Sequence, residues 1–326
     1  MSGCFDDPGL LDPRTVTIDC RDGTSSTLKL QPAIASFSVT HQYLDDDPTA
    51  TPSDLFSIGI KVDDDDGGSD TAVVTLIVNN VAPVASMKLS GPAAVGGGPP
   101  VVPTYDLIEA LGSFTDIGTK DTHQSTISWG DASPLALQKS AGHSYVTPGI
   151  YTIRLTVTDD DGGVGTVASQ VKVVSAEDAL LIARDALFQL SSRGNLNQSA
   201  KAAISRALDD LRGQAEGQAH NGASDLLAKG NNNAALEKIK HALSELNDAG
   251  AIVTNPDLTQ IKLLLALTAE SVAVEFITRV SAVARRPNEL QKILEAKALT
   301  SEGDALLSAQ SFWGAADKYQ AAVQKL

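Results

Sequence analysis

One alternating segment that stops in an acidic glycine turn occurs twice in this chain and limits the folds open to it. Residues 56–68 read FSIGIKVDDDDGG, and residues 151–163 read YTIRLTVTDDDGG. Apolar residues at every second position place one side of a β-strand against a core, and the Asp-Gly run after them favours a tight turn. Each copy therefore predicts half of a β-sandwich.

The repeat extends upstream of both segments. Trp129-Gly130-Asp131 and His143-Ser144-Tyr145 precede the second copy, and Asp22-Gly23 and His41-Gln42-Tyr43 precede the first. Eight residues of the first copy match the second at a constant spacing of 109: Phe5, Asp7, Gly9, Asp12, Thr17, Ile18, Cys20 and Asp22 with Phe114, Asp116, Gly118, Asp121, Thr126, Ile127, Trp129 and Asp131. We expect two β-sandwiches, in residues 1–80 and 84–174.

After Ser175 the apolar period changes from two to 3.6, which is typical of helices. Ser175-Ala176-Glu177-Asp178 has the form of a helix N-cap followed by acids. The Ala- and Leu-rich remainder is interrupted four times, at Gly194-Asn195, Gly230-Asn231, Asn255-Pro256 and Arg286-Pro287. Residues 176–326 are therefore predicted to form a bundle of six or seven helices, with a long helix after an Asn255 cap.

The β half resembles the PKD domain family of Ig-like sandwiches, through Trp129-Gly130-Asp131, His143-Ser144-Tyr145 and the acidic turn at 159–163. Two departures stand out, since Cys20-Arg21 replaces the Trp-Gly of the family pattern and Ala132 replaces a glycine. The end of the helical region resembles one tetratricopeptide hairpin, through Leu299, Gly303, Ala315, Tyr319 and Ala322. The resemblance implies tandem sandwiches of a bacterial surface or secreted protein with a partly tetratricopeptide-like tail.

The first copy is short at its beginning. The second copy has Val84 to Gly112 before its Phe-x-Asp, whereas the first has four residues. The first sandwich is therefore expected to lack its opening strand. A strand from a neighbouring subunit could fill such an open edge. The alternative is that the sequence simply starts after that strand.

Charge and composition exclude several partners. The net charge is −15, and residues 1–175 hold 22 acids against 9 bases, so a nucleic acid would be repelled. Aromatic residues are 4% of the chain, which offers no platform for stacking bases and no broad sugar-binding cleft. No apolar run approaches the roughly 18–20 residues of a membrane span, and the N-terminus has no signal segment. If the protein is secreted, we expect its signal to have been removed.

Acidic loops are the main candidate site. In an Ig-like sandwich the B–C and F–G loops lie at the same end, and this end should also receive the linker carbonyls of Asn79 and Asn80. The loops would bring together five carboxylates in the second copy: Asp116, Asp121, Asp159, Asp160 and Asp161. The first copy has a counterpart in Asp7, Asp12, Asp64, Asp65 and Asp66. Calcium prefers oxygen ligands of this kind; solvated turn acids are the alternative.

No catalytic constellation is evident. His143 and Tyr145 are interpreted as a packing corner, and no Gly-x-Ser-x-Gly, P-loop or dinucleotide fingerprint occurs. Cys4 and Cys20 lack metal-ligand spacing; they form either a disulfide, in an oxidising compartment, or two buried free thiols. The sequence therefore predicts a protein that is not an enzyme.

The leading hypothesis is an extracellular or cell-surface structural or adhesive protein that self-associates into a layer, stalk or fibre. Its sandwiches would be spacers stiffened by calcium, and its helical tail an assembly or docking module. The expected partners of the protein are further copies of itself, other surface proteins or polysaccharide. The alternative is the non-catalytic accessory region of a larger secreted protease or polysaccharide-degrading enzyme. A carbohydrate-binding module is a weaker option, because no exposed aromatic row is evident.

Overall fold

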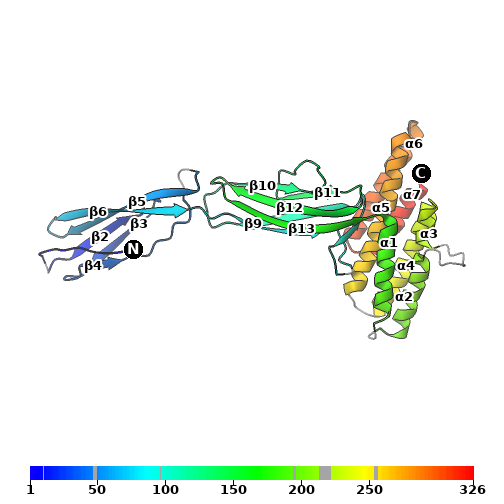
Figure 1. Cartoon of the computed structure of the whole chain (residues 1–326), viewed down its shortest axis with the longest axis horizontal. Coiled ribbons are helices and arrows are strands. Elements are labelled where there is room, and N and C mark those ends of the chain that lie inside the picture. Colours follow the sequence, from blue (N-terminus) through cyan, green and yellow to red (C-terminus); the bar gives the residue numbers. More distant parts are fainter. Residues whose placement is uncertain (10, 47–49, 96, 194–195, 213–221, 253–255) are drawn as a thin grey trace.

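Three parts follow one another along an elongated molecule (Figure 1). The structure, a computed structural model, describes residues 1–9, 11–46, 50–95, 97–193, 196–212, 222–252 and 256–326. We call residues 1–80 the first β module, residues 84–174 the second β module and residues 176–326 the helical bundle. A β-rich N-terminal region followed by a helical region is thus confirmed.

The described residues of the first β module form six strands in two sheets. They are β1 (Ser2–Cys4), β2 (Arg14–Asp19), β3 (Ser25–Leu30), β4 (Ser36–Ser38), β5 (Ser53–Asp64) and β6 (Ser69–Asn79). One sheet has the order β3-β2-β5-β6, and β1 pairs with β4 in the other. Alternate residues of β2 are buried, as the period-two pattern requires. The core is small, consisting of Val16, Ile18, Cys20, Phe37 and Ile58.

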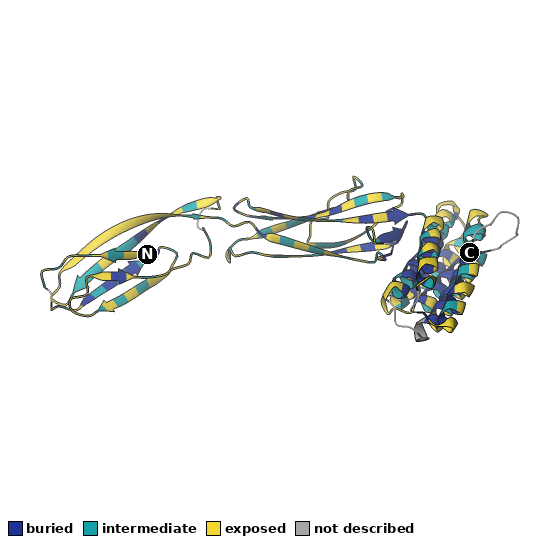
Figure 2. Ribbon diagram, turned by 60° about the horizontal axis from the view of Figure 1, so that its bottom comes forward, coloured by how far each residue is buried: buried dark blue, intermediate teal, exposed yellow. Residues whose placement is uncertain are grey.

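In the second β module, the part that the structure describes forms seven strands, also in two sheets. They are β7 (Val84–Ser90), β8 (Val101–Pro103), β9 (Leu107–Thr115), β10 (His123–Ser128), β11 (Ser140–Ser144), β12 (Gly149–Asp159) and β13 (Val164–Val174). The sheets have the orders β10-β12-β13-β8 and β11-β9-β7. Their facing residues share one core, which includes Ile108, Trp129 and Leu155. This core is larger than that of the first module (Figure 2).

Each β module contains the same packing corner, in which a tyrosine hydroxyl bonds to a backbone carbonyl. The hydroxyl of Tyr145 donates to the carbonyl of Trp129 at 2.6 Å, while His143 stacks on the Trp129 ring and bonds to Asp131 at 2.7 Å. In the first module the hydroxyl of Tyr43 donates to the Cys20 carbonyl at 2.9 Å. The histidine and tyrosine therefore position a strand, in line with the packing interpretation.

At both departures from the family pattern, a residue other than glycine keeps the left-handed backbone conformation of the turn. Gly130 has φ +80°, and a Cβ there would lie 2.8 Å from the carbonyl oxygen of Thr152. Arg21 takes its place in the first module with φ 66°. Ala132 has φ 64°, so its turn keeps the left-handed conformation without a glycine. The turn is therefore retained at a cost in backbone strain.

The C-terminal region contains seven helices among the residues that the structure describes. They are α1 (Ala176–Ser191), α2 (Gln198–Leu211), α3 (Ala223–Ala228), α4 (Asn232–Ile252), α5 (Pro256–Val283), α6 (Pro287–Ser308) and α7 (Phe312–Gln324). The Ser175 side chain caps α1 by accepting from the Asp178 amide at 3.1 Å. Prolines begin α5 and α6, as their fixed φ favours. The predicted breaks at Gly194-Asn195 and the Asn255 cap lie outside the described residues.

The bundle packs directly on the second module. Its core is continuous with Ala93, Val101 and Val174 of that module.

Helices α6 and α7 form a hairpin in which the Tyr319 ring covers Gly303 so closely that a Cβ on residue 303 would lie 2.5 Å from the ring. No helix within the described ranges has the length and apolar character needed to span a membrane.

The cysteines differ from both expectations. Cys4 and Cys20 are free thiols, so the structure does not contain the disulfide. Cys20 is buried in the first core, but Cys4 is exposed, because alternation along the short strand β1 turns its side chain outward. The expectation of two buried thiols is therefore wrong for Cys4.

Candidate metal centre at the junction of the two β modules

Loops from both β modules meet where the linker joins them (Figure 1). The amide of Thr119 donates to the carbonyl of Leu44 at 3.1 Å, which ties the loop after β9 to a loop of the first module. The Asn80 side-chain amide donates to Asp159 Oδ2 at 2.9 Å, and its backbone N–H donates to the Pro52 carbonyl at 3.1 Å. The two modules therefore share one polar surface at this point.

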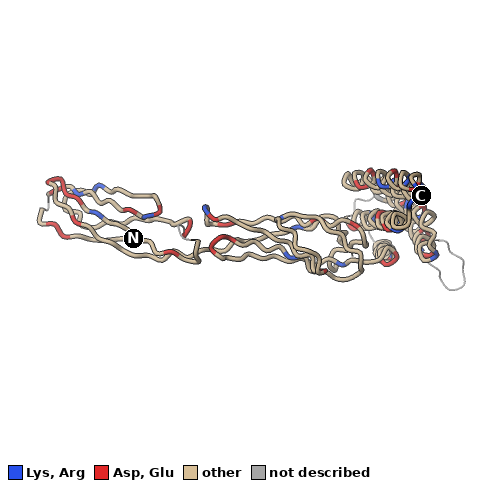
Figure 3. The backbone as a smooth tube through the Cα atoms, turned by 90° about the horizontal axis from the view of Figure 1, so that it is seen from above, with Lys and Arg blue, Asp and Glu red and all other residues tan. Residues whose placement is uncertain are grey.

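Three carboxylates converge on that surface. Asp45, Asp121 and Asp161 each place one oxygen so that all three lie within 4.8 Å of one another. Asp46 lies beside them, and its charge acts on Asp161. Acidic residues gather here and at the far end of the first module (Figure 3). The junction cluster, as we call Asp45, Asp46, Asp121 and Asp161, thus draws equally on both modules.

Two of the four acids of the junction cluster are buried, and the other two are partly exposed. Asp46 is 2% exposed and Asp161 is 6% exposed. Within the described part of the chain, no hydrogen-bond donor reaches one buried oxygen of each of Asp46, Asp121 and Asp161. Buried carboxylates without donors are costly unless a proton or a cation compensates them. These oxygens therefore suit a hard cation.

Burial and mutual repulsion raise the pKa values of the cluster. Burial, followed by a hydrogen bond to Asp45 and the Asp45 charge, raises the pKa of Asp121 to about 7. Burial, followed by the Asp46 charge, raises the pKa of Asp161 to about 6. Burial raises the pKa of Asp46 as well. Between pH 3.8 and about 7 the folded state still holds the Asp121 proton that the unfolded state has released, so stability falls as the pH rises through this range unless a cation replaces the proton.

The donor set fits calcium better than a softer metal. It consists of carboxylate oxygens from several loops, and calcium accepts six to eight oxygens in irregular geometry. Asp116, Asp121 and His123 form a neighbouring group within 4.8 Å, but His123 Nε2 already bonds to Asp116 at 2.8 Å. Asp121 belongs to both groups. An ion held here would link the two modules through their carboxylates.

Two of the five predicted ligands of the second module enter the junction cluster, namely Asp121 and Asp161. Asp116 lies next to it. Asp159 accepts from the Gly163 amide at 2.6 Å and from Asn80, and Asp160 accepts from the Thr122 amide at 2.8 Å. Both residues thus position loops. The linker contributes the amide of Asn80, where its carbonyl was expected.

Sequence reasoning missed Asp45 and Asp46. They lie in the connection 44–52 that precedes β5 in the first module, which is longer than its counterpart 146–148 before β12 in the second. The sequence signal for these residues is that the longer connection carries a run of aspartates, which the second copy lacks. Asp47, the third acid of the run, lies outside the described residues.

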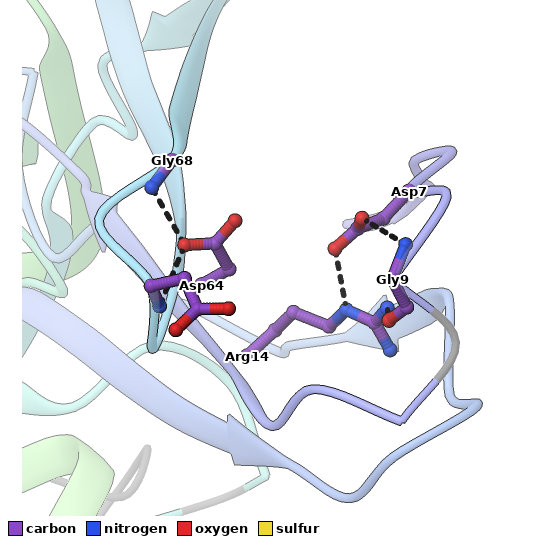
Figure 4. Close-up of polar contacts among 6 residues, drawn as sticks. Asp7, Gly9, Arg14, Asp64 and Gly68 are labelled. Carbon is purple, nitrogen blue, oxygen red and sulfur yellow. Dashed lines mark hydrogen bonds and ion pairs between the residues drawn. The ribbon is translucent and has the colours of Figure 1, made fainter.

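The predicted site of the first module is built differently (Figure 4). Asp7 accepts from the Gly9 amide at 2.8 Å and from Arg14 Nε at 2.9 Å. Asp64 accepts from the amides of Asp66 and Gly68, at 3.1 and 2.6 Å. The remaining acids, Asp12, Asp65 and Asp66, lie within 4.8 Å of one another, but Asp65 and Asp66 are exposed.

Arg14 is the main difference. Its side chain is 2% exposed, and the repeat places it at the position that His123 has in the second module. A guanidinium is always charged, so Arg14 supplies a buried positive charge beside Asp7. The Gly9 hydrogen bond and then Arg14 lower the pKa of Asp7. The first module therefore places a buried guanidinium beside Asp7, at the position that His123 has in the second module.

One comparison with known families finds a domain signature in the second module. A family model described as PKD domain matches residues 90–174. The PKD1 domain of Epp from Vibrio anguillarum is 23% identical over 30% of this chain and 99% of its own, with a TM-score of 0.23. The fibronectin(III)-like modules of CbhA from Clostridium thermocellum are 12% identical over 53% of this chain and 83% of their own, with a TM-score of 0.24.

The conclusion about the second module rests on the family match, because the TM-scores of the two solved structures are low. No curated protein matches the chain. PKD domains are non-catalytic modules typical of extracellular proteins, often adhesive or enzyme-associated ones. Residues 90–174 therefore have the signature of a PKD domain, and the preceding module is connected to it through the internal repeat.

Proposed function

We propose that this chain is a non-enzymatic structural or adhesive protein of the cell exterior, built from two tandem Ig-like sandwiches and a helical docking bundle. The PKD signature at residues 90–174 supports the extracellular setting. The observation that carries the spacer role is the junction cluster, in which Asp45 and Asp46 of one module face Asp121 and Asp161 of the next.

Calcium would stiffen the spacer at this cluster. Without a cation, the carboxylates of the two modules repel each other across the linker, which favours separation of the modules. A calcium ion bound between them reverses the sign of that interaction. The pair of modules then behaves as one rod in a calcium-rich exterior.

An exposed apolar row supports self-association into a layer, stalk or fibre. Leu55, Val73 and Ile77 are 65%, 69% and 61% exposed, and Leu55 pairs directly with Ile77 across β5 and β6. The counterparts of Val73 and Ile77 in the second module are Ala168 and Lys172. Apolar rows of this kind mark contact surfaces. A second copy of the chain is the proposed occupant, because two such rows bury each other around a two-fold axis; this contact pairs two chains, and a second contact elsewhere on the chain continues the polymer.

Calorimetry with calcium tests the junction. We expect the chain to bind one calcium ion per junction cluster, and Asp161→Asn to weaken binding at least about tenfold, as loss of a metal-site group does. Asp65→Asn is the matched control, because it removes an exposed acid of the first module, and it should leave binding unchanged. No heat and no rise in melting temperature with calcium would end the calcium proposal.

Electron microscopy with and without calcium tests assembly. We expect ordered polymers of the full chain in calcium, and their loss in Ile77→Lys, which copies Lys172 of the second module. Monomers of the unaltered chain at high concentration in calcium would contradict self-association. The two tests are separate, since the row on β6 and the junction cluster share no residue.

A further inference from the structure

The first β module has an apolar groove between its two sheets, on the side where β1 and β6 lie. Its volume is about 610 Å³, and Phe5, Phe37, Ile58, Ile60, Val74 and Leu76 contribute to its lining. Asp70 is the only acidic or basic side chain among the lining residues. The groove is therefore largely apolar, and it is lined by residues of β1 and β6 among others.

Strand β7 fills the corresponding place in the second module. It pairs antiparallel with β9, and it also packs on β12 and β13. Its inward residues Ala85, Met87 and Leu89 join the core. The repeat matches β1 to residues 111–113 of β9 and β6 to β13, so this groove is the place of β7. The molecule itself thus contains an example of the ligand that the groove fits.

The first module has no such strand among its described residues. There β1 pairs only with β4, and β6 pairs only with β5. The consequence is visible on β6, where Leu76 is 42% exposed although its counterpart Val171 is fully buried. Two unpaired strand edges flank the same apolar surface, which is the arrangement that accepts an added strand.

We propose that this groove binds an extended strand of another polypeptide. The strand runs antiparallel to β1, as β7 does to β9, and carries apolar residues at every second position. Its other positions are neutral or basic, because residues 1–80 hold 14 acids against 4 bases and the only charge on β7 is Lys88. A second copy is a poor donor, since each described strand of this chain is already paired in its own sheet.

The probe is a synthetic peptide with the sequence of residues 82–91, which contains β7. We expect it to bind the full chain with one-to-one stoichiometry and to slow amide hydrogen exchange in β1 and β6. A peptide carrying Met87→Asp and Leu89→Asp should bind more than about tenfold more weakly, because carboxylates would enter an apolar site. Lys88→Glu in the peptide should also weaken binding, through repulsion from the acidic module.

Two variants of the chain on opposite faces of β6 locate the peptide. Val74→Lys places a charge in the groove and should abolish binding, whereas Ile77→Lys alters the outer face and should leave it intact. Circular dichroism confirms that both variants fold; Val74 is 45% exposed and Ile77 is 61% exposed. The test is independent of self-association, since Ile77→Lys removes the row proposed for assembly.

Three results would overturn the proposal. The first is no binding by the unaltered peptide. The second is protection confined to β9 and β13, which would mean that the peptide exchanges with β7 of the second module. The third is a dimer, seen by light scattering, that excludes the peptide, because a second copy would then occupy the groove.

Discussion

The two β modules share a turn pattern and a histidine–tyrosine corner, yet their acidic ends have different chemistry. In the second module Asp121 and Asp161 are joined by carboxylates of the neighbouring module, and burial together with these charges raises the pKa of both. In the first module the buried Arg14 satisfies Asp7. The same acidic turn therefore has different neighbours in the two modules, which are carboxylates at the junction and a buried guanidinium in the first module.

The cores differ as well. Trp129 is 3% exposed and lies at the centre of a core that β7 closes, whereas Cys20 occupies its position in a smaller core that is open along a groove. Buried apolar area is the main source of stability. We therefore expect the second module to be the more stable of the two.

The largest expected effect comes from truncating these core residues. Trp129→Ala should destabilise the second module by about 3–5 kcal/mol, because it removes a large buried ring and leaves a cavity. Cys20→Ala should cost the first module about 1 kcal/mol. Hydrogen exchange of β12 and β2 amides in urea reports the free energy of unfolding of each module separately.

The unaltered β2 amides in Trp129→Ala serve as the control. Equal losses in β12 and β2 would mean that the modules unfold as one unit, and the comparison of two separate cores would then be wrong.

The next largest effect on stability is expected when the arginine of the first module is introduced at the equivalent position of the second. His123→Arg gives the second module the arginine of the first, next to Asp116 and near Asp121. A fixed positive charge there should compete with calcium. At calcium one hundredfold above its Kd, binding stabilises the unaltered chain by about 2.7 kcal/mol, and the variant should lose most of this gain. Melting temperatures with calcium and with EDTA measure it.

His123→Gln keeps a polar side chain without a fixed charge and is the matched control. It should retain calcium stabilisation. If both variants lost it equally, the His123 ring itself, rather than the absence of a cation, would be what the site needs.

Much of the fold could be predicted from the sequence. Period-two alternation and Asp-Gly turns placed the long strands β5, β6, β12 and β13, and the change of period at Ser175 placed the start of α1. These signals are local, so one sequence is enough to show them. The contact of the bundle with Ala93 and Val101 could not be predicted, because it depends on how separate parts pack.

The candidate site was only partly predictable for the same reason. Asp121 and Asp161 followed from the rule that two loops of a sandwich share an end. Asp45 and Asp46 come from another module and depend on the angle between modules, which no periodicity encodes. Whether an acid is free to bind metal depends on its hydrogen bonds, and these divert Asp159 and Asp160 to loop positioning.

The smallest effect is expected in the pH dependence of stability, where the two acidic ends should differ in sign. In EDTA, Asp121→Asn should stabilise the chain at pH 7, because it removes a carboxyl whose pKa is raised to about 7 by burial. As the pH falls toward 3.8, the unaltered Asp121 becomes protonated in both the folded and unfolded states, so the gain should vanish.

Asp7→Asn should behave in the opposite way. The pKa of Asp7 is lowered by the Gly9 amide and by Arg14, so this carboxylate stabilises the fold above pH 3.8 and the contribution disappears as the pH falls through its folded pKa. The variant should therefore be less stable than the unaltered chain at pH 7 and equal to it in strong acid. Thermal unfolding of both variants from pH 3 to pH 8 gives the sign. An acid whose pKa is lowered by a neighbouring arginine and an acid whose pKa is raised by burial must respond oppositely to protons. Equal signs for the two variants would therefore mean that Arg14 does not distinguish the two acidic ends.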